Sequence, residues 1–193
     1  MSQAASTKSF AECVAERRDL WQLERYATPV GQAVDALVKA LRAGGRVYFF
    51  GNGGSAAEAQ HLAAELSGRF LLDRPAYAGL ALTVDTSALT AIANDYGYEH
   101  IFARQLEGLV RPGDVAVGMT TSGESANVVS GLRTARAKGA VAIAFSGNGG
   151  GTVARESDIA IVGPNGPSWK VQEVHLALGH ILCELVEAAL AAS

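Results

Sequence analysis

Short apolar runs alternate with glycine-rich or polar loops and with helical stripes along most of the chain, from Arg46 onward. Runs of consecutive apolar positions are typical of parallel strands that helices cover on both faces. They predict strands at 47–50, 79–82, 115–119, 141–145 and 159–162. Spacing of apolar positions at helical intervals predicts helices near 55–68, 86–94, 98–109, 125–138 and 168–191. The alternation favours an α/β fold, a doubly wound five-stranded parallel sheet.

The first 45 residues follow a different pattern, which is helical throughout. Ser9 and Glu12 resemble a capping box that opens a helix over 10–25. Thr28-Pro29 is a second helix start, and Gly44-Gly45 ends that helix. Two helices are too short for a core of their own. We therefore expect a helical extension over 1–45 and a main domain over 46–193, within one folding unit.

The last predicted helix is apolar around more than one face. Its apolar positions exceed what one face of a sheet needs, and they include Val171, Val174, Leu178, Ile181, Leu182 and Leu185. The two N-terminal helices share this property. We expect a helical surface buried in a homo-oligomer, although a well-covered monomer core would give a similar pattern.

Composition narrows the class of protein. The chain has 193 residues, of which 49% are hydrophobic and 18% charged, typical of one globular domain. A formal net charge of -3, with Lys and Arg scattered, gives no electrostatic case for nucleic acid. We expect no membrane span, because no apolar segment reaches about 18 residues without charge or glycine. The polar start, Met1 to Lys8, lacks the apolar region of a secretory signal, so we expect a cytoplasmic protein.

Polar loops follow three of the predicted strands, at 51–55, 120–125 and 146–151. Parallel sheets place ligand sites at the carboxyl ends of their strands. The first two loops each precede a helix, and their amides and hydroxyls can donate hydrogen bonds to phosphate oxygens. A shared phosphate site is favoured over plain turns. Glu124 must then point away, because a carboxylate repels a phosphate dianion.

His61 and Glu65 lie four residues apart on the helix that opens at the first loop. This spacing puts an imidazole and a carboxylate on one helical face, where they can handle protons or bind a metal. A solvated ion pair is the common alternative. On the last helix, Gln172 and His180 lie roughly 80° apart around the axis, whereas His175 faces elsewhere. His180 alone could equally be a core histidine.

Four stretches of the chain resemble the phosphoheptose isomerases, which have the sugar-isomerase (SIS) fold. They read GNGGSAAEAQHLAAELSGRF, NDYGYEHIF, TTSGESANVV and VQEVHLALGHILCELVE. The similarity covers nearly the whole chain, and the N-terminal helices match the family's helical extension. Glycine and serine loops specify the SIS fold alone. The combination of His61, Glu65, Gln172 and His180 is more specific.

The resemblance implies a flavodoxin-like SIS fold and conversion of sedoheptulose 7-phosphate to D-glycero-D-manno-heptose 7-phosphate, the first step of ADP- or GDP-heptose biosynthesis. It implies one Zn²⁺ per subunit, held by His61, Glu65, Gln172 and His180. Glu65 would be the catalytic base and His180 the acid, in a homotetramer with active sites between subunits. The implied substrate contacts are Asn52, Gly53, Gly54, Ser55, Asn94, Asp95, Thr120, Thr121, Ser122, Ser125 and Gln172.

One departure from the family lies just before Gln172. Relatives usually carry an aspartate there that contacts the sugar, whereas this chain has no carboxylate nearer than Asp158. Substrate preference or product stereochemistry could therefore differ, and Trp169 could stack on a sugar or fill an interface. Two alternatives remain: a non-catalytic SIS protein that regulates the replication initiator, and a sugar-phosphate sensor. A dinucleotide enzyme is disfavoured because the loop lacks GxGxxG spacing.

Overall fold

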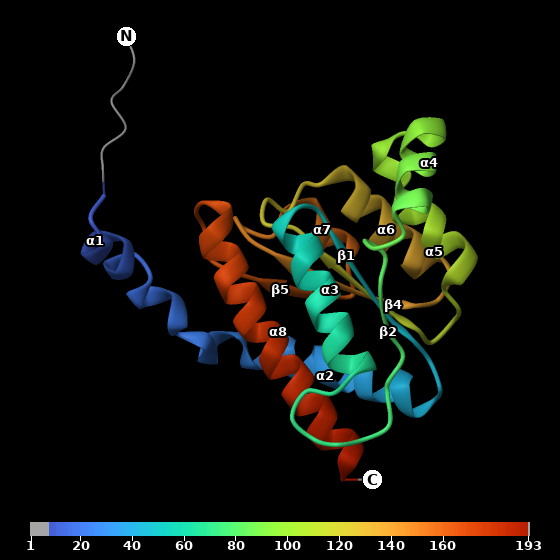
Figure 1. Cartoon of the computed structure of the whole chain (residues 1–193), viewed down its shortest axis with the longest axis horizontal. Coiled ribbons are helices and arrows are strands. Elements are labelled where there is room, and N and C mark those ends of the chain that lie inside the picture. Colours follow the sequence, from blue (N-terminus) through green and yellow to red (C-terminus); the bar gives the residue numbers. More distant parts are fainter. Residues whose placement is uncertain (1–7, 193) are drawn as a thin grey trace.

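A computed structural model describes residues 8–192 and contains a single five-stranded sheet (Figure 1). The strands are β1 (Val47–Gly51), β2 (Gly79–Ala81), β3 (Val115–Met119), β4 (Val141–Ser146) and β5 (Ile159–Val162). Their order is β2-β1-β3-β4-β5, and every neighbouring pair is parallel. The predicted fold class is confirmed. All five strands lie within one residue of their predicted bounds.

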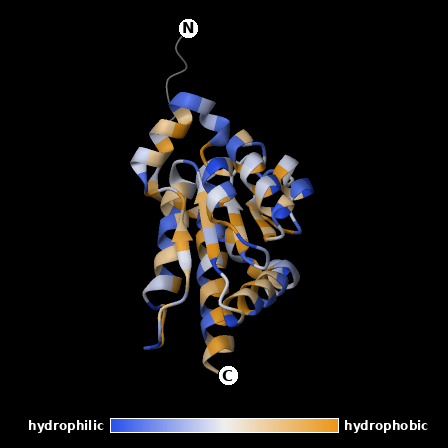
Figure 2. Ribbon diagram, turned by 90° about the vertical axis from the view of Figure 1, so that its right-hand side faces the viewer, coloured by the Kyte–Doolittle hydropathy of each residue, from blue (hydrophilic) through white to orange (hydrophobic). Residues whose placement is uncertain are grey.

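Helices cover both faces of this sheet. One layer holds α2 (Ala27–Arg42), α3 (Gly54–Ser67) and α8 (Ser168–Ala191). The other holds α4 (Thr86–Tyr96), α5 (Ala103–Leu109), α6 (Ala126–Ala137) and α7 (Gly151–Glu156). Alternate residues of each strand face opposite layers. In β1, Phe49 packs with the first layer and Phe50 with the second. Figure 2 shows the strands as largely hydrophobic segments enclosed by the helices.

The N-terminal segment differs from its prediction. The capping box of Ser9 and Glu12 is present, but the helix it opens, α1 (Phe10–Ala15), is short. Two 3-10 segments follow, η1 (Arg18–Trp21) and η2 (Leu23–Tyr26), so a continuous helix over 10–25 is wrong. Leu20 and Tyr26 are both buried. In one straight helix these two positions would point about 120° apart, so the break turns both toward the core.

Other helix boundaries also differ in detail. The helix α2 begins at Ala27, before the predicted cap at Thr28, and no side chain caps it. The helix expected over 98–109 is divided into η3 (Tyr98–His100) and α5. The short α7 was not predicted, because three glycines precede and open it. Residues 1–7 of the polar start lie outside the described residues.

The helix α8 is long and apolar enough to cross a membrane by length and composition alone. In the structure it packs against α2 and α3. Its side chains Val174, Leu178, Leu182 and Val186 belong to the same core as those of α2 and the strands. Core helices of globular proteins meet the same length and composition test, so this is weak evidence for a span.

The division of the chain at residue 45, into a helical extension and a main domain, stays a prediction.

Candidate active site

A cavity of about 310 Å³ lies at the carboxyl ends of β1 and β3. It lies where the two predicted phosphate loops meet, at the start of α8. Its lining is mainly amides, hydroxyls and backbone: Asn52, Gly54, Ser55, Met119, Thr120, Thr121, Ser122, Ser125, Ser168 and Gln172. Within residues 8–192, no cationic side chain lines it. An anion here would meet dipoles and hydrogen-bond donors instead of a fixed positive charge.

Two helices begin at this cavity, and their positive ends favour an anion there. The helix α3 opens at Gly54 after Gly53, which has φ +55°. The helix α6 opens directly after Ser125. Gly54 leaves room for Gln172, because a Cβ at Gly54 would lie 2.3 Å from the Gln172 Nε2 atom. The glycine therefore brings α8 close to the β1–α3 loop.

The hydroxyls of the β3–α6 loop form a connected group. The Thr120 Oγ1 atom lies 2.8 Å from Ser125 Oγ and 3.3 Å from Ser122 Oγ, and Thr121 donates a hydrogen bond to Ser168. Glu124 points away, as predicted. Its carboxylate accepts hydrogen bonds from the backbone and hydroxyl of Thr152 at the start of α7. The Thr152 hydroxyl lowers the pKa of Glu124.

Asn52 is held by residues that the sequence did not reveal. Its side chain exchanges two 2.8 Å hydrogen bonds with the buried amide of Asn127, and it also accepts one from the Tyr98 hydroxyl. Asn127 lies in the first turn of α6, among apolar neighbours. The signal in the sequence that could have identified Asn127 was an amide side chain within an otherwise apolar helical turn. Ser168, at the start of α8, also lines the cavity and was not predicted.

The second predicted feature, the histidine and carboxylate group, is brought together by α3 and α8. The Nε2 atoms of His61 and His180 lie 2.7 Å apart, and His61 Nε2 lies 3.2 Å from the Glu65 Oε1 atom. The side chains of His61 and Glu65 are 44% and 19% exposed, so the group is open on one side.

These three side chains fit a metal ion. One ligand atom from each lies within 4.8 Å of the other two. Two imidazole nitrogens with a carboxylate oxygen is a ligand set that suits Zn²⁺ in catalytic sites. The predicted fourth ligand, Gln172, lies two turns earlier on α8 and lines the cavity. Its part in a metal site stays a prediction.

His175 faces elsewhere, as the sequence predicted. It is fully buried, and its Nε2 atom donates a hydrogen bond to the Ser146 carbonyl oxygen at 2.9 Å. Its Nδ1 atom has no partner. Burial lowers the pKa of His175 to about 4, although the bond to Ser146 opposes this shift. His175 thus ties α8 to the end of β4 as a neutral imidazole.

The cavity lining does not include four residues that the sequence singled out: Gly53, Asn94, Asp95 and Trp169. Asn94 and Asp95 are exposed at the end of α4, where the Asn94 amide donates a hydrogen bond to the Asp95 carboxylate. Trp169 is partly buried, and the Arg17 guanidinium lies 4.0 Å from the centre of its ring. One face of the indole is therefore covered by this chain itself.

The chain is similar to known proteins over most of its length. The SIS domain family model matches residues 14–147. The sequence is 52% identical to a phosphoheptose isomerase of Aquifex aeolicus over 165 residues, which is 86% of each chain.

Two solved structures are similar over nearly their whole length. The phosphoheptose isomerase of Neisseria gonorrhoeae has a TM-score of 0.83 at 38% identity, covering 93% of this chain and 95% of that one. A phosphoheptose isomerase from Francisella tularensis has a TM-score of 0.87 at 31% identity, covering 94% and 100%.

Proposed function

The chain belongs to the SIS-domain family and, within it, to the phosphoheptose isomerases, and from this premise we propose that it converts sedoheptulose 7-phosphate to D-glycero-D-manno-heptose 7-phosphate. The family makes it an isomerase that acts on a phosphorylated sugar. The observation that carries the finer proposal is the group of His61, Glu65 and His180 beside an anion cavity. The reaction would begin heptose activation in the cytoplasm.

The cavity would bind the phosphate of the substrate. Thr120, Ser122 and Ser125 offer hydroxyl donors, and the starts of α3 and α6 add their positive ends. Fixing the distal phosphate orients the reacting carbons, and such positioning can lower a reaction barrier by about 7 to 11 kcal/mol. Asn52, held by Asn127 and Tyr98, would contact a sugar hydroxyl.

Glu65 and His180 would move the protons. An aldose–ketose isomerase transfers a proton between C1 and C2 through an enediolate. We assign the transfer at carbon to the Glu65 carboxylate and the transfer at oxygen to the His180 imidazole. The Glu65 Oε1 atom faces His61, so the second carboxylate oxygen would take the carbon-bound proton. The His61 imidazole, which contacts both Glu65 and His180, would hold these two side chains next to each other.

We propose that Zn²⁺ binds His61, Glu65 and His180, and that Gln172 is the fourth contact in the family pattern. When bound, zinc supplies Lewis-acid stabilisation of the enediolate oxygens. The ligand set of this chain supports the assignment. Binding to zinc would make the Glu65 carboxylate a weaker base. Both roles are compatible if one carboxylate oxygen binds zinc and the other takes the carbon-bound proton.

We also propose a homotetramer in which neighbouring subunits complete the active sites. Large apolar side chains are exposed near the N-terminus and on α8, including Phe10, Trp21 and Leu185. A largely apolar hollow lies between η2, α2 and α8, lined by Leu23, Tyr26, Val30, Leu178, Ile181 and Leu185. Light scattering on the full chain tests the assembly, since a monomer at micromolar concentration would contradict it.

The test of the activity is incubation with sedoheptulose 7-phosphate, followed by NMR of the products. We expect the aldoheptose 7-phosphate to form, and we expect no reaction with unphosphorylated sedoheptulose. A sensor would bind the phosphorylated ketose without product. Absence of product from a folded, metal-loaded chain would contradict the proposed function.

A further inference from the structure

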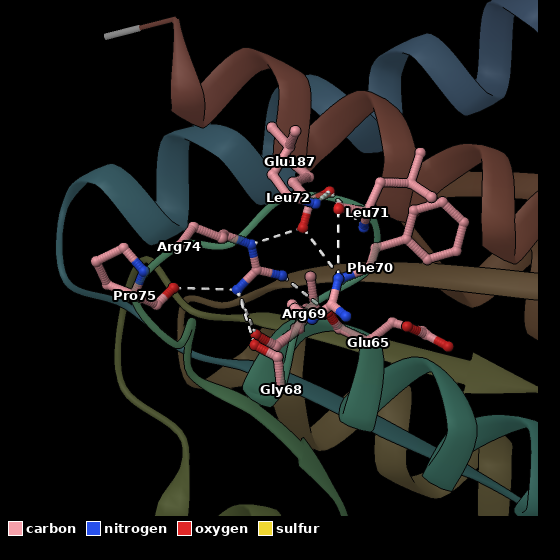
Figure 3. Close-up of polar contacts among 10 residues, drawn as sticks. Glu65, Gly68, Arg69, Phe70, Leu71, Leu72, Arg74, Pro75 and Glu187 are labelled. Atoms are coloured by element: carbon pink, nitrogen blue, oxygen red, sulfur yellow. Dashed lines mark hydrogen bonds and ion pairs between the residues drawn. The ribbon is translucent and has the colours of Figure 1, made fainter.

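A buried carboxylate on α8 holds the segment that links α3 to β2. Glu187 is 2% exposed, and its oxygens accept hydrogen bonds from the backbone amides of Phe70, Leu71 and Leu72 at 3.0, 2.7 and 2.9 Å. The Arg74 Nε atom adds a fourth at 2.8 Å (Figure 3). Burial raises the pKa of Glu187, but these bonds outweigh it and lower that pKa to about 2. Glu187 is therefore a charged anchor.

The partner of this anchor, Arg74, reaches the end of α3. Its Nη2 atom donates a hydrogen bond to the carbonyl oxygen of Glu65 at 2.8 Å, and Nη1 donates to the carbonyl oxygen of Leu66 at 3.0 Å. The last carbonyl groups of a helix lack partners within the helix, and a cation there matches the helix dipole. The Arg74 side chain is 5% exposed, so solvent screens these bonds little.

The same anchor also reaches His180. The amide of Phe70 is bound to Glu187, and the ring of Phe70 lies 5.8 Å from the ring of His180, centre to centre. The ring of His61 also lies near His180, at a centre-to-centre distance of 5.0 Å. Phe70 thus limits the positions that the His180 imidazole can take. Figure 3 shows Phe70 and Glu65 to the right of the Arg74 guanidinium, near its contact with Glu187.

We infer that Arg74 and Glu187 are positioning residues, which hold Glu65 and His180 at the spacing that catalysis requires. This inference rests on the proposed function, in which those two side chains move the protons. One buried ion pair fixes the backbone of Glu65 through Arg74 and the packing of His180 through Phe70. Misplacing reacting groups by about 1 Å can lower a rate by about 100-fold.

The chain offers a matched control for a purely structural role. Asp114 is also 2% exposed, and its carboxylate accepts hydrogen bonds from the backbone amides of Arg46 and Arg111, both at 2.8 Å. It lies just before β3, at the edge of the sheet opposite to the cavity. Glu187→Gln and Asp114→Asn therefore make the same chemical change in two similar anchors. Only the first anchor contacts segments that carry Glu65 and His180.

The experiment compares kcat and KM for these two variants of the full-length, metal-loaded chain. We expect Glu187→Gln to lower kcat by about 10- to 100-fold with KM within about threefold of wild type, because phosphate binding is untouched. Asp114→Asn should leave both constants near wild type. A wild-type kcat for a folded Glu187→Gln variant, or equal losses of kcat in both variants, would overturn the inference.

Arg74→Lys supplies a second variant that keeps the buried charge. A lysine cannot contact Glu187 and the carbonyl oxygens of Glu65 and Leu66 at once, because it lacks the guanidinium fork. We expect a loss in kcat similar to that of Glu187→Gln. The double variant should lose no more than either single one, since both act through one contact. Multiplied losses would contradict a single positioning unit.

A readout independent of turnover separates this inference from the proposed function. Histidine-selective NMR on labelled protein reports the ring of His180, whose signals depend on the neighbouring Phe70 ring. We expect Glu187→Gln and Arg74→Lys to shift the His180 signals and Asp114→Asn to leave them in place. If wild type has no isomerase activity, the proposed function fails, and shifted signals would still support the positioning of His180. Unshifted signals would overturn the inference in either case.

Discussion

The Nε2 atoms of His61 and His180 lie 2.7 Å apart although 119 residues separate them in the chain. Two ring nitrogens this close must share a proton or a cation, because two lone pairs would repel each other. Glu65 supplies a negative oxygen to the same group, and a cation can satisfy all three ligands.

Metal removal should therefore inactivate the enzyme. We expect a chelator to abolish turnover and added Zn²⁺ to restore it. His61→Ala should lose bound metal, measured by elemental analysis, because one of three closely spaced ligands is gone. His100→Ala, at an exposed histidine on η3, is the control and should keep its metal. Full activity in the demetallated wild type would remove the metal from the proposal.

Thr120→Val tests the phosphate cavity. The valine keeps the shape of the side chain but removes the hydroxyl that contacts Ser122 and Ser125. We expect KM for the sugar phosphate to rise by about tenfold, the value of one lost hydrogen bond of about 1.4 kcal/mol. Competitive inhibition by inorganic phosphate should weaken in parallel. Unchanged inhibition would place the phosphate elsewhere.

Gly54→Ala tests the close approach of α8 to the β1–α3 loop. The new Cβ would clash with Gln172, so we expect a large loss of activity from displacement of that side chain. Gly108→Ala is the matched control, because Gly108 lies in α5 with nothing within 4 Å of an added Cβ. That substitution should raise the free energy of unfolding by about 0.5–1 kcal/mol and leave kcat unchanged. Normal kinetics in Gly54→Ala would show that Gln172 is dispensable.

The pH dependence of stability should report His175. Its pKa falls from 6.5 to about 4 in the folded chain, mainly through burial. Between these values the unfolded chain binds more protons than the folded one, so stability is full above pH 6.5 and falls as the pH drops toward 4. The loss should reach about 3 kcal/mol in urea unfolding. His175→Gln should remove this part of the pH dependence, and an unaltered dependence would contradict the assignment.

Sequence patterns predicted the sheet well because buried parallel strands leave a simple apolar signal. The runs at 115–119 and 159–162 match β3 and β5 to the residue. The break between α1 and η1 was missed, since its cause is the inward turning of Leu20 and Tyr26 rather than a proline or glycine. Local spacing cannot show such a tertiary requirement.

The candidate site, like the fold, was predicted only in part from the sequence. Loops and helical spacing predicted a polar cavity at the carboxyl ends of the strands and the approach of His61 to Glu65. Arg74 and Glu187 were not predicted, because their contact spans 113 residues and the segment between α3 and β2 has no periodic pattern. Asn127 was missed for a related reason. Its amide contributes to the site only by binding Asn52, which follows a different strand.

The most direct test of the account is the reaction of wild type and Glu65→Gln with sedoheptulose 7-phosphate in deuterated water. Glu107→Gln, at an exposed carboxylate on α5, is the control. We predict that wild type and control form the aldoheptose 7-phosphate with deuterium at C2, while folded Glu65→Gln forms no product and exchanges no proton. Turnover or exchange near the wild-type rate in Glu65→Gln would contradict the account.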